Sequence, residues 1–221
     1  MKYLKLFENF NKSEIDDICE KYNIENYTIN PDGSIDVEGN VFLYSRNLTK
    51  LPLKFNKVDG YFNCSSNRLT NLEGCPKEVG TNFYCHTNRL TSLMGCPIYV
   101  NDFCCSGNKL TNLIGCPTNV EYFDCAYNNL TSIDGYPKDV CGYFDFRENP
   151  IEPIIHLFMH HCEDIFNYDV RVYLEYQETY NFLRKDCKIV KHLLIEAIKD
   201  YNEYYNKQVE LPKEIEGYTY I

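Results

Sequence analysis

Four consecutive segments decide the fold of this chain. They read VDGYFNCSSNRLTNLEGCPKE (58–78), VGTNFYCHTNRLTSLMGCPIY (79–99), VNDFCCSGNKLTNLIGCPTN (100–119) and VEYFDCAYNNLTSIDGYPKD (120–139). A degenerate copy precedes them from Val37, and VCGYFDFRENPIEPI follows them. Six copies of 20 to 21 residues therefore run from Val37 to about Ile154. Repeats of this length are typical of a solenoid, in which each copy forms one coil that stacks on the next.

Each copy predicts one short strand followed by a return loop. Strand side chains alternate between two faces, so a Phe and the Cys two residues later point the same way. Stacked coils bury both positions, because no single coil can bury its own apolar residues. Burying each Phe contributes about 1.5–3 kcal/mol to the free energy of unfolding. The predicted core comprises Phe62, Phe83, Phe103, Phe123, Phe144 and Phe146, with Cys64, Cys85, Cys105, Cys125, Leu69, Leu90, Leu110 and Leu130.

An asparagine recurs where each strand ends. A buried amide must pair both its NH₂ group and its carbonyl oxygen, so we expect these side chains to bond the backbone. The first copy has Arg46 at this position, which suits a coil in contact with solvent. Regular coiling should end in the last copy, where a proline follows the asparagine. The recurring residues are Asn67, Asn88, Asn108, Asn128 and Asn149.

The fourth and fifth copies read V-x-x-F-x-C-x-x-N-x-L. This resembles the leucine-rich-repeat core L-x-x-L-x-L-x-x-N-x-L, with Val, Phe and Cys in the first three apolar positions. The short period and the Pro in each copy look like the bacterial and phage class of these repeats. The flanking TINPDGSIDV and LPKEIEGY also look like those of short phage-type repeat proteins. The resemblance implies an α/β horseshoe with a concave parallel sheet and, for a chain of phage origin, a host protein as the partner.

The chain has 12 cysteines, which we interpret as small buried apolar side chains. A disulfide or metal ladder is the alternative, because stacked strands lie about 4.8 Å apart, within reach of a disulfide. In-register side chains on parallel strands point the same way, which disfavours bridging. The sequence also lacks a C-x-x-C pair, the spacing that would indicate a zinc site. Strand alternation places Cys104 outward as an accessible thiol. Three further cysteines lie in GCP return loops, namely Cys75, Cys96 and Cys116.

The outward strand positions predict the functional surface. Repeat proteins commonly bind partners through such an extended face. Tyrosine is frequent on it and offers a large, rigid contact area with a polar tip. A merely solvated face is the alternative, since Tyr also suits strands. We predict that the partner-binding residues are Tyr61, Tyr84, His86, Tyr122, Asp124, Tyr127, Tyr143, Asp145 and Arg147.

The flanks predict caps, at residues 1–36 and 153–221, around a solenoid at 37–152. Ser13 with Asp16 three residues later predicts a helix from about Ser13 to Tyr22. The Pro-Asp-Gly sequence that follows predicts a hairpin between two short strands. After Pro153 the apolar spacing becomes helical, and we expect helices over about 154–166, 169–183 and 187–204 before an extended tail.

Charge and composition exclude several function classes. The net charge of −10 and pI of about 5.0 disfavour nucleic-acid binding and electrostatic attachment to anionic membranes. No run reaches the roughly 18 apolar residues of a membrane span. The start of the sequence lacks a signal-peptide pattern, so we expect a cytoplasmic protein, or one in the host cytoplasm if viral.

The sequence predicts a non-catalytic, protein-binding module without a cofactor. It has no Gly-rich phosphate loop and no G-x-S-x-G motif. His156, His160, His161 and Cys162 have metal-ligand chemistry, but a third ligand is not evident around the His156/His160 pair, and we predict no metal. One alternative is a cysteine-dependent, ubiquitin-ligase-like enzyme using Cys162 or Cys187, for which the residues after the repeats are few. A self-assembling structural protein is the other alternative.

Overall fold

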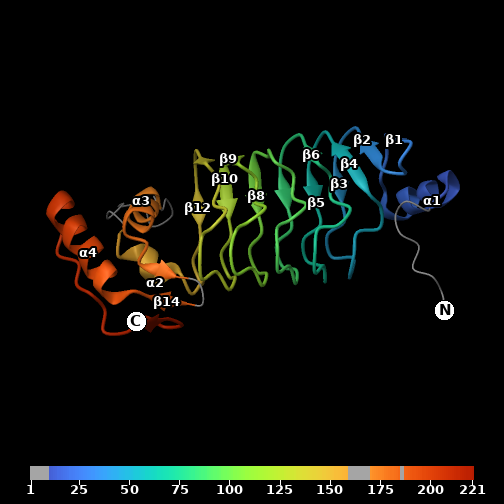
Figure 1. Cartoon of the computed structure of the whole chain (residues 1–221). Helices are drawn as coiled ribbons and strands as arrows, with labels where there is room; N and C mark the ends of the chain where they lie inside the picture. Colours follow the sequence, from blue (N-terminus) through green and yellow to red (C-terminus); the bar gives the residue numbers. More distant parts are fainter. Residues whose placement is uncertain (1–9, 159–169, 185–186) are drawn as a thin grey trace.

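The computed structural model describes residues 10–158, 170–184 and 187–221. Its middle part is a β-solenoid built from parallel strands, with helices towards both ends of the chain (Figure 1). Helix α1 (Lys12–Tyr22) precedes the coils, and α2 (Glu152–His156), α3 (Arg171–Tyr180) and α4 (Lys191–Tyr205) follow them. The solenoid architecture expected from the repeats is therefore confirmed.

Six strands, one from each copy of the repeat, form what we call the main sheet. All neighbouring strands are parallel and the phenylalanines are in register, so that Phe62 pairs with Phe83 and Phe103 pairs with Phe123. The strands lie in spatial order β12-β10-β8-β7-β5-β3. Their bounds are Val41–Phe42 (β3), Phe62–Asn63 (β5), Phe83–Tyr84 (β7), Asp102–Cys104 (β8), Tyr122–Asp124 (β10) and Phe144–Asp145 (β12).

The prediction of one strand per copy is wrong, because a second row of short strands runs beside the main sheet. The repeated valine lies in this second row rather than in the strand of the Phe. Val58 pairs with Val79 and Val140 pairs with Val120, again in parallel. The second row comprises β2 (Ile35–Val37), β4 (Phe55–Val58), β6 (Glu78–Val79), β9 (Asn119–Val120) and β11 (Asp139–Val140).

A tight corner separates the two strands of a coil. In the copies with one additional residue before the Phe, a glycine occupies this corner. A Cβ on Gly60 would lie 2.1 Å from Asn40 Oδ1, and a Cβ on Gly80 would lie 1.9 Å from the carbonyl oxygen of Asp59. The preceding coil therefore leaves no room for a side chain. In these copies the break between the two strands falls at this glycine.

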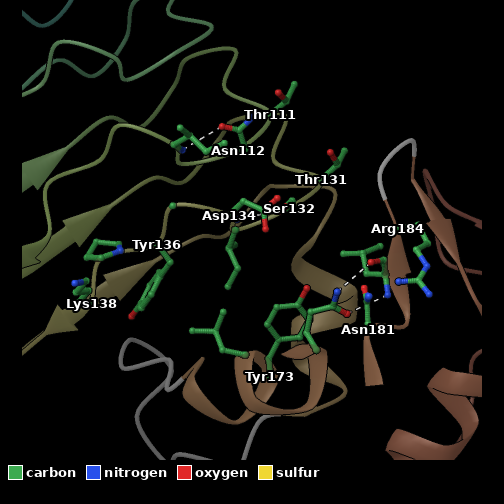
Figure 2. Close-up of a pocket in the computed structure, with 17 residues that line it drawn as sticks. Thr111, Asn112, Thr131, Ser132, Asp134, Tyr136, Lys138, Tyr173, Asn181 and Arg184 are labelled. Atoms are coloured by element: carbon green, nitrogen blue, oxygen red, sulfur yellow. Dashed lines mark hydrogen bonds between the residues drawn. The ribbon is translucent and has the colours of Figure 1, made fainter. Parts of the chain in front are cut away.

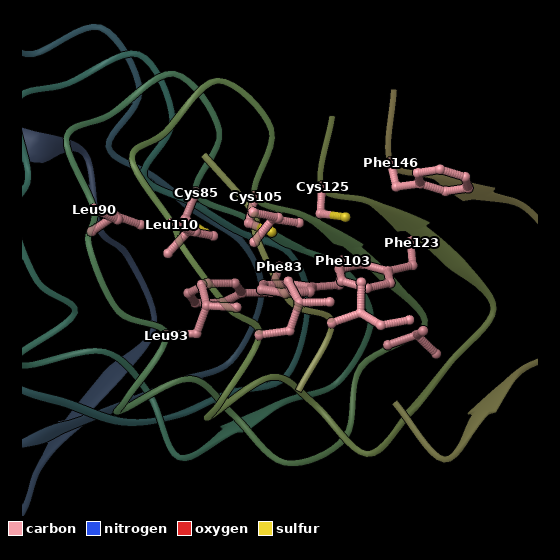
Figure 3. Close-up of a cluster of buried hydrophobic side chains, with 14 of the residues drawn as sticks. Phe83, Cys85, Leu90, Leu93, Phe103, Cys105, Leu110, Phe123, Cys125 and Phe146 are labelled. Atoms are coloured by element: carbon pink, nitrogen blue, oxygen red, sulfur yellow. The ribbon is translucent and has the colours of Figure 1, made fainter. Parts of the chain in front are cut away.

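The phenylalanine ladder forms the centre of the core (Figure 3). The ring centroids of Phe62 and Phe83 are 5.6 Å apart, and those of Phe103 and Phe123 are also 5.6 Å apart. The predicted inward cysteines and leucines lie beside these rings and are fully buried. Because each ring packs against rings of the coils before and after it, the core is continuous along the solenoid.

The asparagine ladder joins successive coils, as predicted. In the fourth copy, the Asn108 NH₂ group donates to the carbonyl oxygens of Cys85 (3.1 Å) and Cys105 (3.0 Å). Asn108 Oδ1 accepts from the backbone N–H of Leu90 at 2.9 Å. Asn88, Asn128 and Asn149 repeat this pattern in their own coils. Each asparagine therefore satisfies backbone groups of two coils at once.

The N-terminal elements differ from the prediction in one detail. Helix α1 begins at Lys12 because Asn11, rather than Ser13, is its N-cap. Asn11 and Glu14 form a reciprocal capping box, with both hydrogen bonds at 3.0 Å. The predicted hairpin is confirmed, since β1 (Tyr27–Ile29) pairs antiparallel with β2.

The C-terminal part contains strands that were not predicted. Strands β13 (Leu183–Arg184), β14 (Lys188–Ile189) and β15 (Thr219–Tyr220) form a three-stranded sheet. The helix expected over 169–183 therefore ends earlier, at Tyr180, and Asn181 caps it with a left-handed backbone (φ 49°). The helix expected over 187–204 begins only after β14, as α4. Pairing with the distant tail decides these boundaries, and the local pattern of apolar residues does not predict such pairing.

Replacing Asn108 with Asp should make stability depend on pH. Asn108→Asp keeps the oxygen that accepts from Leu90 but turns its second oxygen towards two backbone carbonyls. Burial and these carbonyls raise the pKa of the introduced carboxyl in the folded state, whereas the unfolded value is about 3.9. Above about pH 4 the unfolded chain releases its proton first, so the variant loses stability as pH rises, by up to about 1.4 kcal/mol per pH unit.

Urea denaturation of Asn108→Asp at pH 4 and pH 7 measures this effect. Asn129→Asp is the matched control, because Asn129 is exposed one position beyond the next ladder asparagine. It should follow the pH dependence of the unaltered chain. Equal pH dependence of the two variants would show that the ladder amide does not bond as described.

Candidate functional site

The outward face of the main sheet is the candidate site. Tyr61 and Tyr122, predicted to bind a partner, are exposed by 40% and 38%. Tyr127 is exposed by 63%, because its left-handed backbone (φ 54°) turns the side chain away from the sheet. The other predicted residues that contribute surface are half-buried, namely Tyr84, His86, Asp124, Tyr143 and Arg147.

The prediction that Asp145 is an accessible contact residue is wrong. Asp145 is only 5% exposed. Its carboxylate accepts hydrogen bonds from Arg147 Nη2 at 2.6 Å and from the Tyr143 hydroxyl at 3.0 Å. Burial alone would raise the pKa of Asp145, but the hydrogen bonds and charge of Arg147 outweigh it and the pKa is lowered. Asp145 is thus an ionised anchor that holds Arg147 and Tyr143 in place.

A local hydrogen bond explains why Asp or Asn recurs at the position directly after the inward Phe. Asp145 Oδ1 accepts from the backbone N–H of Arg147 at 3.0 Å, and Asp124 Oδ1 accepts from that of Ala126 at 3.0 Å. Asn63 does the same for Ser65. These turns stabilise the end of each strand. Ser65 and Ala126, which strand alternation places outward, are nevertheless buried.

The tyrosines of this face are held in fixed orientations. The rings of Tyr122 and Tyr143 stack with centroids 4.8 Å apart. The Tyr84 hydroxyl accepts from Asn82 Nδ2 at 2.7 Å. Burial raises the pKa of Tyr84 and of Tyr122, and neighbouring carboxylates raise both further. The rings therefore stay neutral at physiological pH and present rigid, amphipathic contact area.

His86 adds a polar but uncharged group to the face. Its side chain is half-buried, and its Nδ1 lies 3.1 Å from the Thr87 hydroxyl. Burial lowers the pKa of His86 below its ordinary value, and the more distant Asp124 opposes this only in part. The imidazole is consequently neutral at pH 7 and adds no positive charge to the face.

Cys104 is less accessible than strand alternation suggested. Its thiol donates to Asp124 Oδ2 at 3.2 Å and lies 3.2 Å from the Ser106 hydroxyl. Burial, followed by the charge of Asp124, raises the pKa of Cys104 to about 12. Eleven cysteines lie among the described residues and all have free thiols, of which Cys141 is exposed.

A cavity of about 970 Å³ lies between the last coils and the helical part of the chain. Figure 2 shows Thr111, Thr131 and Asp134 on the side of the coils, and Tyr173 and Arg184 on the other side. Burial raises the pKa of Tyr173 far above its ordinary value, so the hydroxyl remains protonated. No sequence motif marks this cavity, because its two walls come from segments that are distant along the chain.

Part of the histidine cluster lies outside the described residues, namely His160, His161 and Cys162. His156 is described, and its Nε2 lies 3.9 Å from Glu152 Oε1. Within the described ranges, no group of three His, Cys, Asp or Glu side chains is arranged to hold a metal ion. None of the helices in those ranges combines the length and the apolar character needed to span a bilayer.

Comparisons with protein-family models, curated proteins and solved structures found no match to this chain. The arguments for a function therefore rest on the repeat pattern and on the surfaces of the solenoid.

Cys104 should resist alkylation while Cys141 reacts. A thiol with a pKa near 12 carries about one part in 10⁴ of the reactive thiolate at pH 8, so iodoacetamide should modify Cys104 slowly. Asp124→Asn removes the nearby negative charge and should increase the rate at Cys104. Peptide mapping by mass spectrometry after timed alkylation measures both sites, with Cys141 as the internal control. Equal rates at Cys104 and Cys141 in the native chain would contradict the described environment.

Proposed function

We propose that this chain is a non-catalytic binding module of the leucine-rich-repeat type, which captures a protein partner on the outward face of its main sheet. The observation that carries the proposal is the concentration of exposed aromatic residues along this face. Exposed aromatic side chains gathered on one face of a repeat protein are typical of protein-binding surfaces. Those on or beside this face are Phe42, Tyr44, Tyr61, Tyr122 and Tyr127.

Preorganisation of the face supports the same proposal. Binding loses free energy when mobile side chains must be fixed, and rings that are already held reduce this loss. Tyr122 is stacked on Tyr143, and Tyr143 is anchored through Asp145 to Arg147. The main-sheet ladder fixes the backbone beneath them. Such rigid aromatic groups beside satisfied polar ones resemble the hot spots of protein interfaces.

The polar groups of the face indicate how specificity would arise. Asp102 and Asp124 lie in adjacent coils among the tyrosines, and Asp102 accepts from Asn82 at 2.7 Å. A partner that places hydrogen-bond donors against these carboxylates and apolar atoms against the rings would match the face. A partner that placed a negative charge against these carboxylates would lose several kcal/mol of binding free energy.

Removing two rings from the face should abolish capture of the partner without unfolding the chain. Interface hot-spot aromatics contribute about 2 kcal/mol or more each, so Tyr84→Ala with Tyr122→Ala should weaken binding by well over about tenfold. Affinity capture by the tagged full chain from a bacterial lysate, followed by mass spectrometry, identifies the partner. Titration of the purified partner then gives the two dissociation constants.

A matched double variant controls for the loss of two tyrosines. Tyr99 and Tyr204 are exposed by 68% and 80%, away from the face: Tyr99 pairs with Asn119 in the second row, and Tyr204 lies on α4. Tyr99→Ala with Tyr204→Ala should leave binding unchanged. If both double variants bind the partner equally well, and both melt like the unaltered chain, the face is not the binding surface.

A further inference from the structure

Strand β3 forms the N-terminal edge of the main sheet. Its Val41 and Leu43 N–H groups donate to the carbonyl oxygens of Tyr61 and Asn63 in the next coil, both at 2.8 Å. The buried, inward residues of β3 therefore direct their backbone groups towards the second coil. This direction is the same in every coil, since Phe62 N–H donates onward to the third coil at 3.0 Å.

The outward residues of β3 direct their backbone groups the other way. In a parallel ladder, residues of one strand alternate between the neighbours on either side. In the second coil, the outward Tyr61 and Asn63 use their carbonyl groups to pair with the coil before them. Phe42 of β3 and Tyr44, in the turn that follows β3, hold the same positions in the first coil, and no described strand lies on that side of β3. Their N–H and C=O groups are thus left for an added strand.

The other exposed parts of this end are covered by the chain itself. Strand β1 pairs with β2 and extends the second row beyond the first coil. Helix α1 buries Ile15 and Cys19 in the core. The described elements before the first coil therefore extend the second row and pack on the core, and none of them pairs with β3.

This edge has neither the charge nor the proline that commonly prevents pairing with another chain, although β3 itself is only two residues long. Residues 40–44 read NVFLY, with no charged residue and no proline. The Phe42 and Tyr44 side chains are exposed by 48% and 52%, and their rings contact each other edge to face at 6.4 Å. An added strand would gain both backbone hydrogen bonds and contact with these rings.

We propose that β3 accepts an extended segment of a partner protein, which adds a strand to the main sheet through the backbone of Phe42 and Tyr44. The segment would have alternating β-branched or aromatic side chains without charge at its centre. Helix α1 and strand β1 lie beyond the first coil along the solenoid (Figure 1), so a second solenoid would meet them before reaching β3. This site is separate from Tyr84 and Tyr122 on the face.

Amide hydrogen exchange with a synthetic strand tests the proposal. The probe is a blocked peptide, Lys-Thr-Val-Thr-Val-Thr-Lys, added in millimolar amounts to the full chain. Exchange at Phe42 and Tyr44 should be fast in the free chain and about twofold slower at half-saturation, because the amides are open only in the unbound half. Leu43, already bonded to Asn63, should exchange slowly throughout. The same peptide with proline in place of valine should protect neither amide.

Two variants separate backbone pairing from side-chain contact. Phe42→Pro removes one outward N–H and leaves the bonds of Val41 and Leu43 intact. An edge strand tolerates proline at such an outward position. It should abolish protection of the Tyr44 amide by the peptide, whereas Phe42→Thr should retain it. The combination Tyr84→Ala with Tyr122→Ala should also retain it, which distinguishes this site from the face. If Phe42→Pro does not fold, the proline peptide tests the same bonds.

Three results would overturn the proposal. Equal protection by the valine and proline peptides would mean that the peptide contacts side chains only. Absence of protection at millimolar peptide would mean that the edge does not pair. If exchange at Phe42 and Tyr44 is slow in the chain alone, and becomes slower as the protein concentration rises, the edge pairs with a second copy of the chain.

Discussion

The fold depends on one hydrogen-bond arrangement, in which a buried asparagine bonds the backbone of two coils at once. Where the chain leaves the main sheet, carbonyl groups of successive coils point into the core with no strand partner. Asn108 donates to one carbonyl in its own coil and one in the coil before, and its oxygen accepts from Leu90. An unpaired polar group at this depth would destabilise the chain by several kcal/mol. An ionised Asp or an apolar residue at this position would therefore destabilise the chain, and the repetition of the asparagine joins each coil to the one before it.

That register has consequences for the core and for the surface. Because Phe83, Phe103 and Phe123 pack ring against ring on successive coils, a thin coil can bury a large ring that it could not bury alone. The strand residues on either side of each Phe point outward on every coil. They contribute little to packing, so the surface they form is available for binding, and its tyrosines lie on a rigid base.

The outward residues nevertheless serve two purposes. The carboxylates of Asp124 and Asp145 each accept a backbone N–H two residues later, which stabilises the turn after the strand. Asp145 is then covered by Arg147, while Asp124 keeps part of its surface and receives the thiol of Cys104. A carboxylate on this face is consequently a turn-stabilising group first and a binding group only where its neighbours leave it accessible.

The repeat by itself determined the solenoid, the inward phenylalanines and cysteines, and the asparagine ladder, because these follow from strand alternation and a fixed period. The hairpin before the coils was equally local, since Pro-Asp-Gly specifies its own turn. Only the tertiary structure decided the second row of strands, the burial of Asp145 and the C-terminal sheet. Each depends on a neighbour that is distant in sequence: the previous coil at Gly60, Arg147 folding over a carboxylate, and the tail that pairs with β14. A periodic pattern specifies the face of the strand from which a side chain projects. The packing of the whole chain decides which groups cover that side chain.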